Sequence, residues 1–361
     1  MAFNNQEILN QIVHPVEKAV FKSMRTDMET GKALLNPQQL GQFLRHATLN
    51  QTVLKDATFD ILTSYEKEYV QTGINGRVLQ PGYDSNGDTQ TELDAADVDF
   101  DVTLLQTTKL KAMCSIQDDE KDDNIEKEAF EQTLLTMMGE RTGEDLEVWN
   151  LFSDKTLTSS PGDSAEHKQI TKFLSNNNGW IKQSGHTLKS SDVIDAEGSG
   201  RADFAPTTGT VLDMFDAMIY AMPLRLRQRN NLKFYVPFEV EDAYRNYLAS
   251  RGTALGDATQ TGFATPLMYK NIPIVNCQSF DAEDMRVYFQ KGFCMLTNPT
   301  YLQYGIWKNL SIEPDRIPKE ERTDYYYRLR AGNATVFKGL PTVVAEVSVD
   351  ELAEMPDAAR V

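Results

Sequence analysis

The acidic run from Asp84 to Asp88 comes closest, by residue type and spacing, to a known chemical site. Asp84, Asn86 and Asp88 place oxygen atoms at alternate positions, as in the opening of a calcium-binding loop. Thr89 stands where the sharp turn of that loop requires glycine, and Ala95 stands where a bidentate glutamate should lie. We therefore interpret the run as a solvated acidic turn. A calcium-dependent binding module remains an alternative, which a calcium titration would decide.

The sequence predicts no catalytic, cofactor-binding or metal site. The glycine-rich stretch 252–262 lacks the Lys-Ser/Thr pair that follows the last glycine of a phosphate-binding loop. The four histidines stand singly, without the spacing of a Ser/His/Asp triad or of a metal site. No carboxylate stands in an apolar context that would predict a raised pKa and acid-base chemistry. We therefore expect a structural protein with no cofactor rather than an enzyme.

The cysteines and the basic residues also have structural interpretations. Cys114, Cys277 and Cys294 lie far apart, so we expect three reduced thiols in the core. The one notable basic cluster consists of Arg225, Arg227, Arg229 and Lys233. Arginines two apart suit one face of an extended segment, which would pair with the carboxylates of a neighbouring copy. The alternative interpretation of this cluster is an ordinary solvated face.

The segment 97–104 alternates polar and apolar residues without interruption, which is typical of a strand with one buried face. A second strand is expected within 58–78, which is rich in Tyr, Ile, Val and Phe. The polar stretch 79–96 contains two turn signals between them, so the two arms form a hairpin. The apolar side chains of the second arm are Val98, Phe100, Val102 and Leu104.

This hairpin is too long to pack on its own domain. Two arms of about 20 residues make a ribbon of roughly 60 Å, whereas a chain of this length has a radius of gyration of about 20 Å. A two-stranded ribbon is marginal alone in water, so we expect its apolar face to lie on another copy of the chain. The run 65–70 would also suit a helix, and this alternative shortens the ribbon.

Helices are expected on both sides of the hairpin. Residues 1–57 contain small amphipathic helices but too few apolar residues for a core, so Leu40, Phe43 and Leu44 are predicted to contact neighbours. A long helix is predicted over 124–151 because negative charge precedes an apolar stripe of helical spacing. The members of this stripe are Phe130, Leu134, Met137, Met138, Leu146 and Trp149.

The remaining pattern mixes helices and strands without βαβ regularity, so the predicted fold class is α+β. Residues 152–206 are predicted to be loops and short hairpins. Helices are predicted over 210–222 and 238–250 on the spacing of their apolar residues. Short strands are predicted over 233–236, 272–276, 286–289, 293–296, 310–313 and 324–330.

Composition excludes several classes of function. The chain has 361 residues with 53 acidic against 36 basic side chains, and its formal net charge is −17. This charge argues against tight sequence-independent binding to nucleic acid, because such affinity comes from neutralised phosphates, and the alternative interpretation of the charge is solubility alone. The sequence contains no run of 18 apolar residues and no signal peptide, so we expect a soluble protein made in the cytosol. We also expect the chain to keep its N-terminal segment in the final assembly.

The ordered set of elements resembles the major capsid proteins of tailed double-stranded-DNA bacteriophages, whose fold is shared with encapsulin nanocompartments. The resemblance covers about residues 54–341. The hairpin matches the E-loop over 59–115, and the long helix matches the spine helix. The other matching segments are 210–222 and 234–237 for the central A-domain, 266–275 for the Pro-containing strand that follows, and 322–330 for the last long strand of the peripheral P-domain.

The resemblance implies a shell protein that forms pentamers and hexamers of an icosahedral head around genomic DNA, without sequence-specific DNA contacts. It implies assembly in the host cytoplasm, residence in the virion and no membrane. Portal, scaffold or decoration proteins are the further partners that it implies. The expected divisions are 1–57 for the N-terminal arm, 58–117 for the E-loop, 118–209 for the P-domain with spine helix, 210–309 for mainly the A-domain, and 310–361 for the P-domain return strand and tail.

Two further expectations follow from the resemblance. Some family members form an autocatalytic isopeptide crosslink, but Lys109 and Lys111 lie near the hairpin base and no lysine stands between Arg77 and Lys109. We therefore expect no such crosslink. An encapsulin-like cargo shell is the alternative with the same fold, although a leader of more than 50 residues before the hairpin favours a phage arm. An adjacent gene that encodes a cargo enzyme would favour the cargo shell.

Overall fold

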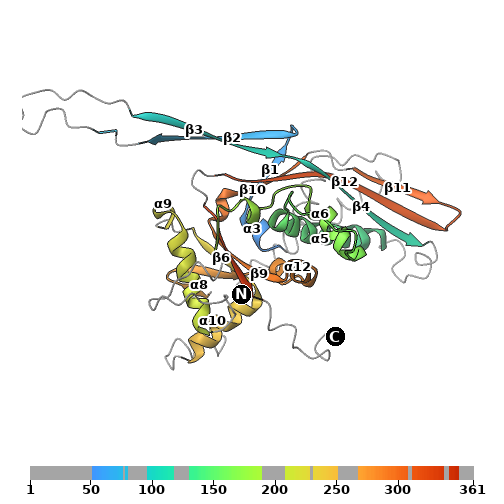
Figure 1. Ribbon diagram of the computed structural model, residues 1–361. Coiled ribbons are helices and arrows are strands. Elements are labelled where there is room, and N and C mark those ends of the chain that lie inside the picture. The colour runs from blue at the N-terminus through green and yellow to red at the C-terminus, as the bar shows by residue number, and fades with distance from the viewer. Residues whose placement is uncertain are drawn as a thin grey trace, which may run out of the picture.

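The structure is a computed structural model that describes residues 51–75, 78–79, 96–117, 130–188, 208–227, 231–250, 267–307, 311–336 and 341–348. Three sheets and a set of helices make up this part of the chain (Figure 1). The predicted leader contacts Leu40, Phe43 and Leu44 lie outside the described residues. So do the acidic run 84–88, the glycine-rich stretch 252–262 and Arg229.

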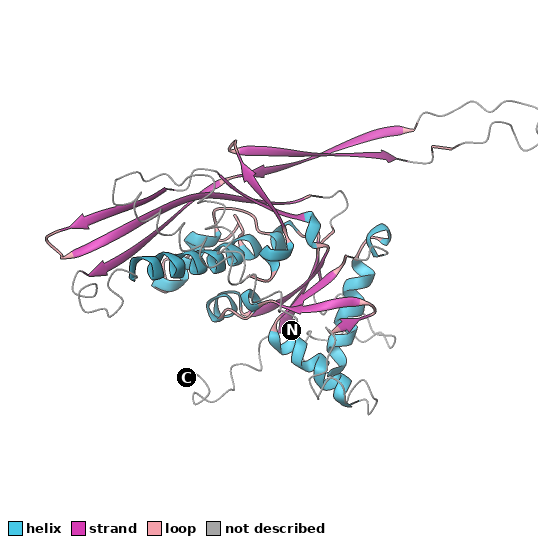
Figure 2. Ribbon diagram, turned by 180° about the vertical axis from the view of Figure 1, so that it is seen from behind, coloured by secondary structure: helices cyan, strands magenta, loops and turns pink. Residues whose placement is uncertain are grey.

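A five-stranded sheet is built around one long strand, β12 (Arg322–Thr335). Strand β4 (Thr108–Gln117) pairs antiparallel with β12 from Arg322 to Ala331. Strands β11 (Ser311–Ile317) and β10 (Leu302–Trp307) also pair antiparallel with β12, and β1 (Thr58–Leu62) adds to β10 in parallel. The long helix α5 (Phe130–Phe152) runs along one face of this sheet (Figure 2).

A six-stranded sheet forms the second body, in the order β5-β13-β9-β6-β8-β7. Helices α8 (Thr208–Ala221) and α10 (Phe238–Ser250) pack beside it. The strand bounds are His186–Leu188 for β5, Val343–Ser348 for β13, Lys291–Thr297 for β9, Lys233–Val236 for β6, Ile272–Asn276 for β8 and Met268–Tyr269 for β7.

Strand β9 shows why the strands of this sheet have continuous runs of apolar residues in the sequence. Phe293 and Met295 belong to the core that contains Trp149 of α5, whereas Cys294 and Leu296 belong to the core under α8 and α10. Successive side chains of a strand point to opposite faces, so β9 contributes to both cores. The six-stranded sheet therefore separates two apolar cores.

Several sequence predictions are confirmed by the described elements. The strands predicted over 233–236 and 272–276 and the helix over 238–250 have the predicted bounds, and α8 covers most of the predicted 210–222. Cys277 and Cys294 are buried free thiols, as expected, while Cys114 is half-buried. The mixture of helices and sheets is that of an α+β fold.

Other predictions are wrong. The predicted strand 286–289 is the end of helix α12 (Glu283–Phe289), because two acidic residues begin the helix and Gln290 ends it in a left-handed conformation. The segment 152–206 contains helix α6 (Ala165–Leu174), whose N-terminus is capped by the Ser164 hydroxyl, and the short helix α7 (Trp180–Gln183). Met137 of the predicted stripe is 60% exposed, whereas Leu146 and Trp149 are buried.

In the part of the chain that the structure describes, no helix is long and apolar enough to cross a membrane. Three short connecting helices complete the fold. They are α3 (Val53–Asp56), η3 (Gln278–Phe280) and η4 (Pro299–Tyr301).

Candidate intersubunit surface

The predicted hairpin is a separate two-stranded ribbon formed by β2 (Glu66–Asn75) and β3 (Asp97–Gln106). The strands are antiparallel, with Val70 opposite Val102 and Ile74 opposite Val98. This pairing confirms the hairpin and rules out the alternative helix at 65–70. The ribbon projects away from both sheet bodies (Figure 1).

The predicted arms were too long at their base. Residues 58–62 form β1, which pairs with β10, and 108–117 form β4, which pairs with β12. The chain leaves the five-stranded sheet at Tyr65 and returns at Thr107, whose backbone N–H donates to the Tyr65 carbonyl at 3.0 Å. Ten paired residues per strand correspond to roughly 33 Å of ribbon.

One face of this ribbon is apolar and exposed, as the alternation predicted. Because directly opposite residues share a face of the ribbon, the apolar side chains of β2 extend the stripe of β3. The exposed fractions are 49% for Val98, 63% for Phe100, 52% for Val102, 43% for Leu104, 60% for Val70 and 54% for Ile74. We call these six residues the ribbon face.

Near its base, the opposite face of the ribbon is attached to its own subunit. Leu105 is fully buried in a cluster with Leu62, Ala334 and Val336. The Tyr69 hydroxyl donates to Asp60 at 3.0 Å, and burial, together with Asp60, raises the pKa of this phenol above its usual value. At the base of the ribbon, the body of the subunit therefore lies on the side opposite the ribbon face.

Close contacts set the direction in which the ribbon leaves the body. The ring of Tyr65 stacks on Trp307 at 4.6 Å between centroids, and the Arg330 guanidinium lies 4.4 Å from the centroid of Tyr65. Gly332 of β12 lies so close to the returning strand that an added Cβ would be 2.4 Å from the Gln106 carbonyl oxygen. The ribbon therefore has a packed base and an uncovered outer face.

The predicted basic cluster has a different structure from the one expected. Residues 224–227 form the short helix α9 rather than an extended segment. The Arg227 guanidinium donates to the Met222 carbonyl at 2.7 Å and lies 5.5 Å from the centroid of Tyr220, and Lys233 pairs with Asp56 at 2.8 Å. The described side chains thus contact their own subunit. The side chain of Arg225 lies outside the described residues, and intersubunit contacts of the arginines stay a prediction.

Sequence reasoning missed Glu147, a carboxylate in an apolar context. Glu147 is 1% exposed and accepts hydrogen bonds from the backbone N–H groups of Val53 and Leu54 at 3.1 and 3.2 Å and from the Ser279 hydroxyl at 2.7 Å. Burial raises the pKa of this carboxyl, while the hydrogen bonds oppose the rise. Glu147 lies four residues before the buried Leu151, and this helical spacing was the available signal.

Glu147 joins three segments far apart in the sequence, namely α3, α5 and η3, and so has a structural role. Among the described residues, no group of three or more His, Cys, Asp or Glu side chains could hold a metal ion. The ribbon face, with its six exposed apolar side chains, is therefore the candidate functional surface.

Comparison with solved structures shows which known fold this chain has. A chain of the satellite phage P4 procapsid aligns over 87% of this chain and 91% of its own length, with a TM-score of 0.59 and 13% identity. A chain of Mycobacterium phage Ogopogo covers 82% and 92%, with a TM-score of 0.51 and 8% identity. A native gene-transfer-agent capsid covers 84% and 91%, with a TM-score of 0.51 and 11% identity. The fold is that of phage major capsid proteins.

A relative in sequence agrees with this class. The putative prophage capsid protein YqbE of Bacillus subtilis (strain 168) is 25% identical over 349 residues, which are 96% of this chain and 99% of the relative. No family model matches the chain. The fold and this relative agree, because both are those of phage capsid proteins, which are structural proteins rather than enzymes.

Proposed function

We propose that this chain is the major capsid protein of a tailed phage or prophage, and that its copies form the pentamers and hexamers of an icosahedral head around double-stranded DNA. The observation that carries the proposal is the uncovered ribbon face on a ribbon whose other side is attached to its own subunit. A neighbouring copy is the partner that covers this face.

The energetics favour coverage by a neighbour. Fully burying a Val, Leu, Ile or Phe side chain contributes about 1.5–3 kcal/mol, before the cost of association. A contiguous exposed apolar stripe along a strand pair is a liability for a free monomer, since it invites uncontrolled association. A head-to-tail contact that closes on itself gives a ring, and rings that share one contact build a closed shell.

We assign the named parts of the capsid fold to the observed elements. The five-stranded sheet with α5 corresponds to the P-domain and its spine helix. The six-stranded sheet with α8 and α10 corresponds to the A-domain. The β2–β3 ribbon corresponds to the E-loop, within the broader predicted division 58–117.

The chemistry of the chain suits a container for DNA. A net charge of −17 disfavours tight binding to phosphates, so DNA would be enclosed rather than bound by sequence. We expect the chain to assemble in the host cytoplasm and to reside in the virion, with portal, scaffold or decoration proteins as further partners. Lys109 and Lys111 lie opposite Arg330 and Arg328 on β12, at the base of the ribbon. We therefore propose a shell without a lysine crosslink at the ribbon tip.

Electron microscopy of the chain, expressed alone and together with its flanking head genes, tests this function. We expect closed icosahedral shells with pentamers and hexamers in at least one preparation. A protein that stays monomeric in both preparations, or particles that lack this chain, would contradict the proposal. The relatives named above are capsids of a satellite phage, a phage, a prophage and a gene-transfer agent, and they give no support to the cargo-shell alternative.

A further inference from the structure

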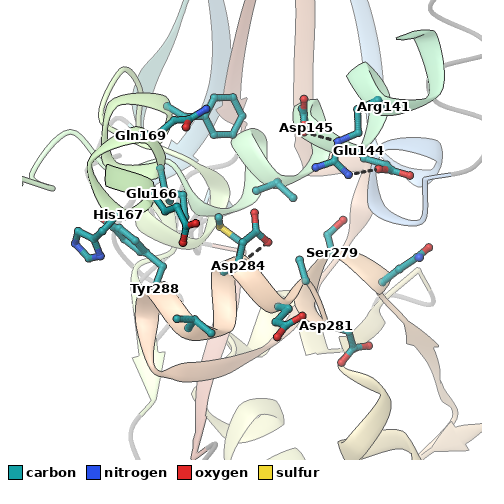
Figure 3. Close-up of a pocket in the computed structure, with 18 of the residues that line it drawn as sticks. Arg141, Glu144, Asp145, Glu166, His167, Gln169, Ser279, Asp281, Asp284 and Tyr288 are labelled. Atoms are coloured by element: carbon teal, nitrogen blue, oxygen red, sulfur yellow. Dashed lines mark hydrogen bonds and ion pairs between the residues drawn. The ribbon is translucent and has the colours of Figure 1, made fainter. Parts of the chain in front are cut away.

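An open cleft lies between α5, α6, η3 and α12, apart from the ribbon (Figure 1). Its volume is about 1130 Å³. Pockets for small molecules measure about 300–1,000 Å³, so the size of this cleft favours a peptide segment as its occupant. Figure 3 shows the side chains that line it.

Part of the lining is apolar. Val148 of α5 and Ile170 and Phe173 of α6 line the cleft as partly buried side chains that pack against the core. Val287 of α12 also lines it and is 71% exposed. An amphipathic helix binds by placing its apolar face on such a surface. The cleft therefore offers an apolar contact to a partner segment.

The rest of the lining is strongly acidic. Among the described residues that line the cleft are six carboxylates, and Arg141 is their one Lys or Arg side chain. Arg141 pairs with Glu144 at 2.8 Å and with Asp145 at 3.4 Å, and Asp281 pairs with Arg286 at 2.7 Å. The six carboxylates are Glu144, Asp145, Glu166, Asp281, Glu283 and Asp284.

The other three carboxylates have no cation within the described ranges of the chain. They are Glu166, Glu283 and Asp284. Each lies in the first turn of its helix, where negative charge is favourable. This local role explains their positions in α6 and α12, but not why both helix starts lie at one cleft with the carboxylates of α5.

Like charges from α5 and α12 approach each other in the cleft. Burial raises the pKa of Asp145, the pairing with Arg141 opposes the rise, and the neighbouring Glu144 and Asp284 add to it. The carboxylates of Asp145 and Asp284 are both labelled in Figure 3. A positive charge placed between them would relieve their repulsion.

Gln51 adds a hydrogen-bonding group to the lining. Its side chain lines the cleft and is 8% exposed. In the part of the chain that the structure describes, this side chain forms no hydrogen bond. A buried amide without a partner is unfavourable, so this group also points to an occupant with polar backbone atoms.

We propose that this cleft binds a cationic amphipathic segment of a second protein. Its apolar side chains would lie on Val148, Ile170 and Val287, and a Lys or Arg would lie between Asp145 and Asp284. The chain carries a net charge of −17, so a basic protein is attracted whereas a further copy of the chain is repelled. This inference goes beyond the proposed shell function and does not depend on it.

Fluorescence anisotropy with the unassembled full chain tests the inference. The probe is a labelled peptide of about 14 Leu and Lys residues, with the leucines at helical spacing. Glu166→Gln/Asp284→Asn should weaken binding at least about tenfold, because it removes two carboxylates that have no cation. The matched control Asp99→Asn/Asp101→Asn removes the same charge from the ribbon and should leave binding unchanged.

Circular dichroism checks that both double variants stay folded. Two results would overturn the inference. One is no binding to the unmodified chain, which is also expected if another segment or a further copy fills the cleft. The other is an equal loss of binding in the two double variants.

A second comparison separates the cleft from general attraction to an acidic chain. Replacing the leucines of the peptide by serine keeps its charge and should weaken binding at least about tenfold. Val287→Ser should weaken binding of the leucine peptide about threefold, whereas Val102→Ser on the ribbon face should not. Both valines are exposed, so neither change threatens the fold.

Equal binding of the leucine and serine peptides would overturn the inference, as would unchanged binding by Val287→Ser. Peptide binding is measured on unassembled protein, and shell formation is seen separately by electron microscopy. Failure of one proposal is therefore distinguishable from failure of the other.

Discussion

Phe100 and Leu105 lie five residues apart on strand β3 and therefore on opposite faces of it. Leu105 is fully buried against its own subunit, whereas Phe100 is 63% exposed. An odd separation in a strand has this consequence because side chains alternate with a period of two. One strand thus both attaches the ribbon to its subunit and presents an apolar surface outward.

The first prediction concerns the attached side of the ribbon. Leu105→Ala should lower the free energy of unfolding of the monomer by roughly 2–5 kcal/mol, because it opens a cavity beside Leu62 and Val336. The matched control Leu104→Ala removes the same atoms from the exposed face, so the monomer should lose less than about 1 kcal/mol. Urea unfolding measures the free energy of unfolding of both variants. Equal losses would show that the two faces are not distinct.

The second prediction concerns the crossing of β12 and the ribbon base. Gly332→Ala should destabilise the monomer, because the new Cβ would lie 2.4 Å from the Gln106 carbonyl oxygen and 2.9 Å from Leu105. The control Gly73→Ala lies within the ribbon, where an added Cβ meets nothing within 4 Å. Thermal unfolding should show a clear loss of Tm for the first variant alone. A harmless Gly332→Ala would contradict the close crossing.

The third prediction concerns the buried carboxyl of Glu147. Its pKa is raised above the usual 4.5, so the folded protein holds the proton more tightly than the unfolded chain does. The stability from this group is fully present below pH 4.5 and is lost as pH rises through the raised pKa. Glu147→Gln should remove this contribution, which is at most about 1.4 kcal/mol per pH unit.

Urea unfolding across this pH range compares Glu147→Gln with the control Glu144→Gln, whose side chain is 51% exposed. The control should keep the pH dependence of the unmodified protein. An unchanged pH dependence in Glu147→Gln would show that Glu147 titrates as an ordinary surface carboxylate.

The predictions from sequence succeeded where a local pattern was decisive. The alternation in 97–104 identified both the strand and its exposed apolar face, because a period of two depends on the strand alone. Strand 233–236 and helix 238–250 were also found with their bounds. The ordered set of such elements was enough to indicate the capsid fold.

The failures occurred where tertiary contacts decide. Arg286 to Phe289 have strand propensity, but their end of α12 is held by packing of Tyr288 and Phe289 against the core. At Tyr65 and Thr107 the chain passes between the five-stranded sheet and the ribbon. No local signal marks these two positions, because the segments on both sides of each form strands. Glu147 was missed because its hydrogen-bond donors come from residues about 94 and 132 positions away.

The fourth prediction concerns the cohesion of the assembled shell. Cys277 and Cys294 are buried free thiols, and the described lysines Lys109 and Lys111 lie at the ribbon base. We therefore expect mature particles to be held by non-covalent contacts. Boiling in detergent and reductant should give a single monomer band on a denaturing gel. A ladder of higher bands would reveal covalent crosslinks and contradict this prediction.

The proposed shell function depends most on coverage of the ribbon face by a neighbouring copy. Phe100→Asp should leave a folded, soluble monomer with unchanged circular dichroism, since Phe100 is already exposed to water. Each intersubunit contact would lose a buried Phe and gain an unpaired carboxylate, at a cost of several kcal/mol. The control Thr103→Asp adds the same charge to the opposite face of the same strand.

Negative-stain electron microscopy of particles from the two variants is the most direct test. We expect closed shells of normal diameter for Thr103→Asp and no closed shells for Phe100→Asp. Normal shells from Phe100→Asp would contradict the claim that the ribbon face is the intersubunit contact.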